Sequence, residues 1–307
     1  MSSQASPLRD YLTLHFLVVI WGFTAILGLL ISIPSLEVVF FRTLIATGLL
    51  LALFGIKGYS FRVENRELAK IIGTGFIISL HWILFFWAAR VSNASVCLAG
   101  MATTSLWTAF VEPIANGKKI KWYEILLGLI VISGLYVVFS FEFDYWLGLV
   151  MAVASAFLCA IFTVINGRLT KRHSPFTITL YEMMGACAFA GVFMLVYAGF
   201  FSEQGLQLLP LPMDWLWLFL LGGVCTVYAF SVSVELMRRL SAFAINLTVN
   251  LEPVYGIILA VLIFREKEQM TAGFYLGTLI ILVSVLLYPL MVFLDKKRSA
   301  KRIALGN

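Results

Sequence analysis

The chain has 307 residues, of which 61% are hydrophobic and only 12% are charged, and its mean hydropathy is +0.97. Soluble proteins carry about a quarter charged residues, so the composition excludes an ordinary soluble domain and predicts an integral membrane protein. The formal net charge of +6 comes from basic residues in short loops between apolar runs, with no basic and aromatic surface that would suit nucleic acid. We therefore expect the lipid bilayer as a partner and no nucleic acid.

Ten apolar segments follow one another along the chain, each close to the ~20 residues that cross a bilayer as a helix. Tryptophan residues lie at several segment ends, as expected for an interfacial aromatic belt. The sequence thus predicts an all-α integral membrane protein with ten transmembrane helices. Their expected bounds are 11–31, 36–54, 68–89, 94–113, 122–141, 145–168, 176–200, 214–237, 242–264 and 270–293.

The positions of the basic residues predict how these helices are oriented. If the N-terminus is cytoplasmic, most of the 22 Lys and Arg residues fall in loops and tails on the cytoplasmic side, which is the bias that sets membrane topology. A missing or additional span would destroy this alternation. We therefore expect a multi-pass protein of the plasma (inner) membrane with both termini in the cytoplasm.

An internal duplication relates the two halves of the chain. A shift of 149 residues lays Arg90-Val91-Ser92 on Arg239-Leu240-Ser241, and Thr104 on Pro253. Each half holds five spans, an odd number, so the second half enters the membrane from the opposite side. Such inverted repeats are a recurring plan of secondary transporters, which bind substrate near the midplane between the repeats. The alternative is a duplication kept for stability alone.

The sequence accordingly predicts two inverted five-helix repeats. The first spans residues 1–143, and the second spans residues 144–307 and ends in a basic cytoplasmic tail. A Glu-Pro pair, Glu112-Pro113, lies at the inner end of the fourth segment. We expect this pair to stop the helix, because proline removes a backbone donor and clashes with the preceding turn.

A second pair, Glu252-Pro253, lies near the middle of the ninth segment. A carboxylate at that depth costs several kcal/mol and usually has a partner, a proton or a water-filled cavity. Proline there frees a backbone carbonyl and favours a kink. Together the two residues predict a polar centre within the membrane.

The stretch from Asn250 to Phe264, closed by Glu266, resembles the ninth-helix signature of the EamA family, which belongs to the drug/metabolite transporter superfamily. Trp21 and Arg42 also match positions typical of the first repeat of that family. The resemblance implies a ten-helix exporter of amino acids or other small metabolites. A chain of this length is expected to form its pathway as a monomer.

Polar and aromatic side chains at similar depths form the candidate site for substrate binding or coupling. They are Glu252, Asn250, Asn246, His81, Trp82, Trp21, Trp107, Thr104, Tyr228, Glu182 and Arg42. Glu252 either contacts a substrate ammonium group, carries a coupling proton, or fastens the kinked helix to its neighbour. Asn246 and Asn250 form a second polar stripe, about 200° around the same helix.

The other candidates each have a structural alternative. Arg42 and Glu182 act as gate or carboxylate-binding residues, or else pin their helices to neighbours or reach toward headgroups. His81 titrates near neutral pH when unperturbed, so it binds substrate or carries a proton, or else is a structural hydrogen-bonding group. The deep tryptophans line a pocket or fill the core, and the hydroxyls line a polar path or bond back to their own helix.

These observations favour a secondary transporter that exports small polar metabolites, with protons as the candidate coupling ion. The four cysteines form no CxxC pair and the three histidines are widely separated, so we expect no cofactor, no metal and no enzymatic activity. The alternatives are a membrane-embedded enzyme, a lipid flippase or a passive channel of similar architecture.

Overall fold

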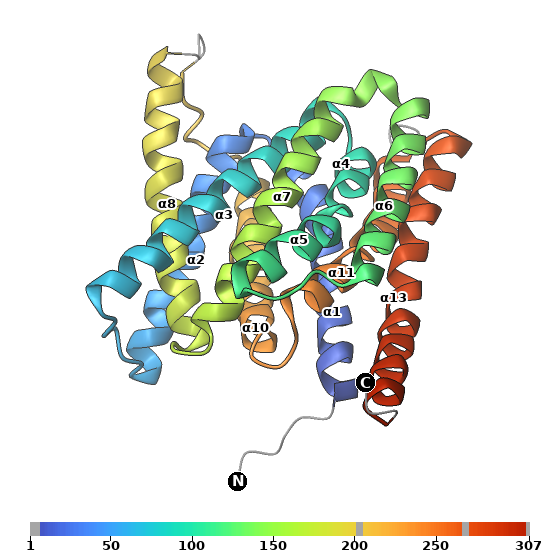
Figure 1. Ribbon diagram of the computed structural model, residues 1–307. Helices are drawn as coiled ribbons and strands as arrows, with labels where there is room; N and C mark the ends of the chain where they lie inside the picture. The colour runs from blue at the N-terminus through green and yellow to red at the C-terminus, as the bar shows by residue number, and fades with distance from the viewer. Residues whose placement is uncertain (1–6, 201–204, 266–269, 305–307) are drawn as a thin grey trace.

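The computed structural model of the protein describes residues 7–200, 205–265 and 270–304. Throughout these ranges the chain forms a bundle of long helices without strands (Figure 1). The first half contains α1 (Pro7–Leu30), α2 (Ser35–Lys57), α3 (Asn65–Val91), α4 (Ala94–Met101), α5 (Thr104–Asn116) and α6 (Trp122–Phe141). The predicted fourth span is therefore divided into two helices.

The second half repeats this plan after a single turn, η1 (Phe143–Tyr145). Its elements are α7 (Trp146–Leu169), α8 (Pro175–Phe200), α9 (Pro212–Phe219), the π-helical segment η2 (Leu220–Tyr228), α10 (Ala229–Leu236), α11 (Ala242–Val249), α12 (Glu252–Phe264) and α13 (Ala272–Ala304). The ninth predicted span is also divided, into α11 and α12. Glu266, which closes the ninth-helix motif, lies outside the described residues.

Nine helical segments in the described part of the chain are long and apolar enough to cross a membrane. The tenth helix, α13, begins with a further apolar stretch, Ala272–Ser284. The prediction of an all-α membrane protein is thus confirmed. Helix α13 continues to Ala304, through the basic residues of the expected tail.

The two divided spans break at equivalent points of the two repeats. Ala102 falls on Leu251 under the shift of 149 residues, and each lies in the turn between two helices. Pro253 follows the second break, whereas the first repeat has Thr104 at that place and uses hydroxyl groups instead. Thr103 and Thr104 donate to the carbonyls of Gly100 and Met101 at 2.8 and 2.6 Å, and such bonds compete with the helical ladder.

The expected helix stop at Glu112-Pro113 is wrong by one turn. Helix α5 continues through Pro113 to Asn116 and ends at Gly117, whose φ of 63° is a conformation that glycine adopts readily. The carboxylate of Glu112 accepts a hydrogen bond from the backbone N–H of Phe243 at 2.7 Å. The residue therefore joins α5 to the start of α11.

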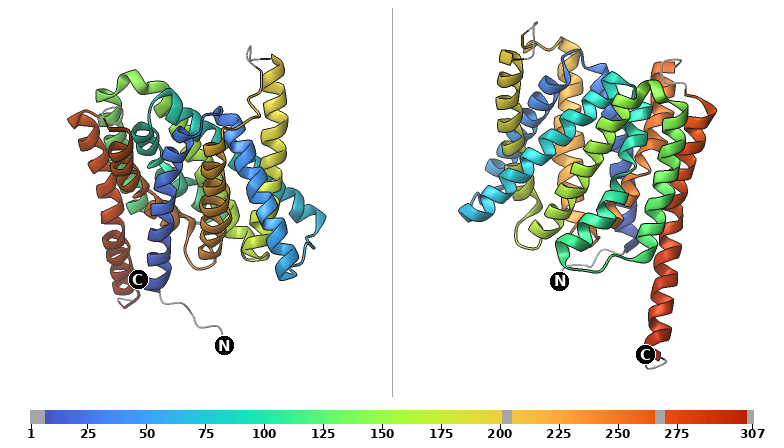
Figure 2. Two further views of the ribbon diagram at one scale, coloured as in Figure 1. Left: turned by 180° about the vertical axis from the view of Figure 1, so that it is seen from behind. Right: turned by 45° about the horizontal axis from the view of Figure 1, so that its top comes forward.

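The start of α1 and the end of α13 lie at the same end of the bundle, which we call the terminal face (Figure 2). Arg239 forms a bidentate ion pair with Asp10 near this start, with N–O distances of 2.8 and 3.0 Å. At the other end of α1, Arg90 donates to the carbonyls of Gly28 and Ile31 at 3.1 and 3.0 Å. Arginines that correspond in the two repeats thus hold the two ends of one helix.

Candidate functional site

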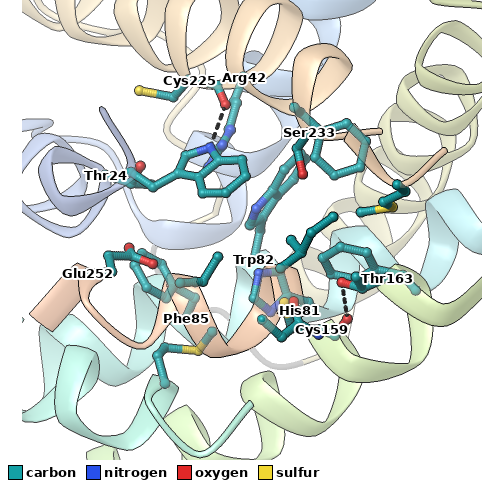
Figure 3. Close-up of a pocket in the computed structure, with 18 residues that line it drawn as sticks. Thr24, Arg42, His81, Trp82, Phe85, Cys159, Thr163, Cys225, Ser233 and Glu252 are labelled. Atoms are coloured by element: carbon teal, nitrogen blue, oxygen red, sulfur yellow. Dashed lines mark hydrogen bonds between the residues drawn. The ribbon is translucent and has the colours of Figure 1, made fainter. Parts of the chain in front are cut away.

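A central cavity of about 80 Å³ lies among helices of both repeats (Figure 3). Helices α1, α2, α3 and α4 contribute from the first repeat, and α7, η2, α10, α11 and α12 contribute from the second. The predicted site residues that line it are Trp21, Arg42, His81, Trp82, Asn246 and Glu252. The structure therefore brings together, at one place, side chains that are up to 231 positions apart in the sequence, namely Trp21 and Glu252.

Arg42 is the most constrained charge in this cavity. Its side chain is only 2% exposed, so it does not extend to the membrane surface. The guanidinium Nε donates to Thr226 Oγ1 at 2.8 Å, and Cζ lies 3.9 Å from the ring centroid of Trp82. Its Nη1 atom is buried with no hydrogen-bond partner in the described residues. An unpaired buried donor is costly, and the described residues leave this N–H capacity of Arg42 unused.

The π-helical segment η2 holds two of these groups in place. Trp21 Nε1 donates to the carbonyl of Cys225 at 3.1 Å. The hydroxyl oxygen of the neighbouring Thr226 accepts the hydrogen bond from Arg42 Nε. The Thr226 hydroxyl in turn donates to the carbonyl of Leu221 at 2.7 Å. π-Helical turns are rare and frequently lie at functional sites. Sequence reasoning missed this segment, since the Gly222-Gly223 pair within it is only a weak signal.

Glu252 is the first residue of α12 and lies directly after the helix break. It is 6% exposed and lines the cavity on a different side from Arg42 (Figure 3). No direct ion pair joins the two within the described ranges of the chain, so a gap separates a cation from a carboxylate. Such a gap can be bridged by a molecule that carries both charges.

His81 is anchored to α7 through Ser155. Its Nδ1 lies 2.9 Å from the carbonyl oxygen and 2.7 Å from the hydroxyl of Ser155, and that hydroxyl donates to the carbonyl of His81 at 2.8 Å. A carbonyl can only accept, so Nδ1 carries the proton in this arrangement. In the neutral ring, Nε2 is then the available acceptor. The ring also packs edge-on against Phe162, with centroids 5.3 Å apart.

The asparagines of α11 and the turn after it bind α5. Asn246 Nδ2 donates to Thr108 Oγ1 at 2.8 Å, and Asn250 Nδ2 donates to Ser105 Oγ at 2.6 Å. Only Asn246 also lines the cavity. These two bonds join the broken helices of the two repeats beside Glu252.

The remaining predicted residues, Thr104, Trp107, Tyr228 and Glu182, do not line the cavity. Thr104 donates to the carbonyl of Met101 across the break between α4 and α5, and Trp107 packs edge-on against Phe157 with centroids 5.2 Å apart. Tyr228 is 46% exposed, and its ring centroid lies 6.5 Å from that of Phe16. These side chains contact neighbouring helices instead.

Glu182 is fully buried in α8, away from the cavity. Asn166 Nδ2 donates to its Oε2 at 3.4 Å, while its Oε1 has no partner in the described part of the chain. Arg42, at a similar depth in the corresponding helix of the first repeat, does line the cavity. The two repeats are therefore not chemically equivalent at this level.

Sequence reasoning also missed several cavity residues, including Thr24, Cys159, Phe162 and Thr163. Their residue types are common in apolar helices and carry no signal on their own. Within the described ranges, no group of three or more His, Cys, Asp or Glu side chains is arranged to hold a metal ion.

A helical bundle whose broken helices meet at a buried polar cavity has the architecture of a secondary transporter. The model of the EamA-like transporter family matches residues 9–140 and 146–289. The chain therefore belongs to the EamA-like transporter family of the drug/metabolite transporter superfamily.

Two curated relatives are also described as transporters. The chain is 25% identical over 258 residues to the uncharacterised transporter YxxF of Bacillus subtilis, a match that covers 79% of this chain and 78% of the relative. It is 26% identical over 161 residues to the uncharacterised transporter sll1164 of Synechocystis sp., which covers 52% of this chain and 43% of the relative. Less than half of the second relative is thus matched.

One solved crystal structure is similar over 93% of this chain and 99% of its own, with a TM-score of 0.68 and 16% identity. At this low identity, the likeness concerns the fold alone.

Proposed function

We propose that the protein exports small zwitterionic metabolites, amino acids or related compounds, by alternating access to the central cavity. The observation that carries this proposal is the presence of a buried guanidinium with an unpaired Nη1 and a separate carboxylate in one cavity. Arg42 suits the carboxylate of an amino acid, because a guanidinium binds carboxylates through charge-assisted hydrogen bonds. Glu252 suits the ammonium group, and the aromatic walls suit the side chain.

The volume of the cavity supports a cycle with more than one state. Ligand sites are usually ~300–1,000 Å³ in volume, whereas this cavity measures about 80 Å³. An amino acid would enter only after the surrounding helices separate. The breaks beside Glu252 and at Ala102 provide places where the two repeats can bend.

We assign the terminal face to the cytoplasm and the protein to the plasma (inner) membrane, since the basic residues favour this side. The single chain supplies both repeats, so it acts as a monomer. A proton is the proposed coupling ion, with Glu252 as its carrier. The other titratable groups that line the cavity are Arg42, His81, Cys159 and Cys225. The cycle needs no ATP, since transport runs on ion and substrate gradients.

Competition in proteoliposomes tests the substrate class. We expect efflux of a labelled amino acid to be inhibited by unlabelled amino acids, but much less by the methyl ester, which lacks the carboxylate, or by the α-keto acid, which lacks the ammonium group. Arg42→Gln should reduce the preference for the amino acid over the ester. Glu252→Gln should reduce the preference for the amino acid over the keto acid. Each loss should be ten- to hundredfold, since charge-assisted hydrogen bonds are worth ~1.5–3 kcal/mol.

Arg66→Gln is the matched control, because Arg66 is an exposed cation that does not line the cavity. Equal inhibition by all three compounds, or unchanged preferences in both cavity variants, would refute the proposed substrate class. Flux that is insensitive to an imposed pH gradient would remove the proton from the mechanism. Single-channel conductance, or lipid movement without metabolite flux, would identify a channel or a flippase instead.

A further inference from the structure

A second cavity lies at the surface of the bundle and shares no lining residue with the proposed substrate site. It measures about 600 Å³ and lies between the first turns of α3, from Glu67 to Ile77, and the end of α7 with the following turn, from Ile165 to Arg172. We call it the α3–α7 groove. Figure 1 shows the N-terminal end of α3 diverging from the C-terminal end of α7 at the terminal face.

The end of the groove at the terminal face is basic. Lys70, Arg168, Lys171 and Arg172 all line it, against the single carboxylate of Glu67. Glu67 accepts a hydrogen bond from Lys70 at 2.5 Å and lies 3.7 Å from Arg172 Nη1. One carboxylate cannot neutralise four cations, so this end attracts an anionic group.

The deeper end of the groove is apolar and open. Ile77 of α3 and Ile165 of α7 form its walls, with Gly73 between them and the basic end. A Cβ atom added at Gly73 would meet no atom within 4 Å, so the absence of a side chain there contributes to the width of the groove. The Thr74 hydroxyl donates to the carbonyl of Lys70 in its own helix at 2.9 Å and does not fill the space.

We propose that the α3–α7 groove binds an anionic phospholipid, with its phosphate among the four cations and one acyl chain along Ile77 and Ile165. The order of chemistry along the groove, from basic at the membrane surface to apolar in its interior, matches that of a lipid molecule. Basic pockets between transmembrane helices on the cytoplasmic side bind acidic headgroups in this manner. A free phosphate would use only the basic end and leave the apolar walls uncovered.

Binding of phosphatidylglycerol to the full-length protein in detergent micelles tests this site, with phosphatidylcholine and inorganic phosphate as the comparison ligands. We expect phosphatidylglycerol to bind more tightly than either of the others. Lys171→Gln/Arg172→Gln should weaken its binding about 25-fold, which corresponds to ~1 kcal/mol for each cation removed. Gly73→Leu should weaken binding of phosphatidylglycerol without changing any charge, because the new side chain occupies the apolar part of the groove.

Two control variants match these changes. Lys118→Gln/Lys119→Gln removes the same charge from the loop between α5 and α6, and Gly48→Leu adds the same side chain at another glycine whose Cβ would meet nothing within 4 Å. Both should bind phosphatidylglycerol like the unmodified protein. An equal loss in the control charge pair, or equally strong binding of inorganic phosphate, would overturn the proposal. Unchanged binding in a folded Gly73→Leu variant would also overturn it, and the charge pair decides the matter if that variant does not fold.

Discussion

At the residue scale, the central cavity joins charges that apolar helices normally exclude. Arg42 is tolerated because Thr226 accepts from its Nε and Trp82 covers the face of its guanidinium. Neither contact occupies Nη1. The contacts that stabilise the cation therefore also fix the position of Nη1 and leave it available to the proposed substrate.

This arrangement predicts that two similar substitutions lower the free energy of unfolding by different amounts. Thr226→Val removes the acceptor of Arg42 Nε and leaves a second buried donor unpaired, so it should lower the free energy of unfolding by about 1–3 kcal/mol. Thr163→Val serves as the control, because Thr163 also lines the cavity but its hydroxyl donates only to the carbonyl of Cys159 in its own helix. The control should cost less than about 1 kcal/mol in unfolding experiments in detergent. Equal costs would contradict the role assigned to Thr226.

The sequence identifies some site residues well because their residue types are rare in apolar segments. Arg42, His81 and Glu252 stand out against their surroundings, and all three line the cavity. Phe162 could not be found this way, since a phenylalanine in a membrane helix is unremarkable without knowledge of which face it presents. The depth of a residue in the membrane can be read from its position in an apolar segment. The direction in which its side chain points depends on how the helices pack, which the sequence does not give.

At the element scale, two local irregularities limited prediction. Each additional residue rotates the helix position by about 100°, so a π-helical segment changes the face of every side chain near its end. Tyr228, the last residue of η2, is 46% exposed. The break between α4 and α5 was also missed, because it has threonine hydroxyls where the second repeat has proline.

The packing of α3 against α8 predicts opposite effects for neighbouring glycines. A Cβ at Gly75 would lie 2.2 Å from the carbonyl oxygen of Glu182, a backbone atom that cannot move aside easily. Gly75→Ala should therefore destabilise the protein by about 2 kcal/mol or more. Gly73→Ala has open space, and should instead stabilise it by up to about 1 kcal/mol through helix propensity. Thermal unfolding of both variants in the same detergent checks this, and a shift of the same sign in both would refute the packing argument.

At the scale of the whole molecule, the inverted repeat places matching groups at opposite membrane faces. Arg239 and Arg90 correspond in the two repeats, and each holds one end of α1. The Asp10 carboxylate, hydrogen-bonded to Arg239, raises the pKa of that guanidinium above its usual value. The stability that this adds is fully present below the usual arginine pKa, so the Arg239 guanidinium stays charged throughout the physiological pH range.

The inverted arrangement predicts that the two arginines have opposite effects on the balance between the two open states when each is removed. Arg239→Gln releases α1 at the terminal face and should favour opening toward that face, whereas Arg90→Gln should favour opening toward the other. A partly buried ion pair contributes roughly 1 kcal/mol, which corresponds to about a fivefold shift between the two states. Cys159, which lines the cavity, can report this shift once the other three cysteines are replaced by alanine.

A membrane-impermeant maleimide added at the terminal face should label Cys159 about fivefold faster in Arg239→Gln and more slowly in Arg90→Gln. Asp10→Asn should reproduce the effect of Arg239→Gln, because it removes the other half of the same ion pair. The double variant should return the labelling rate toward that of the parent, since its two changes act against each other. Faster labelling in both single variants would mean that each change merely loosens the bundle. The two arginines would then have no role in alternating access.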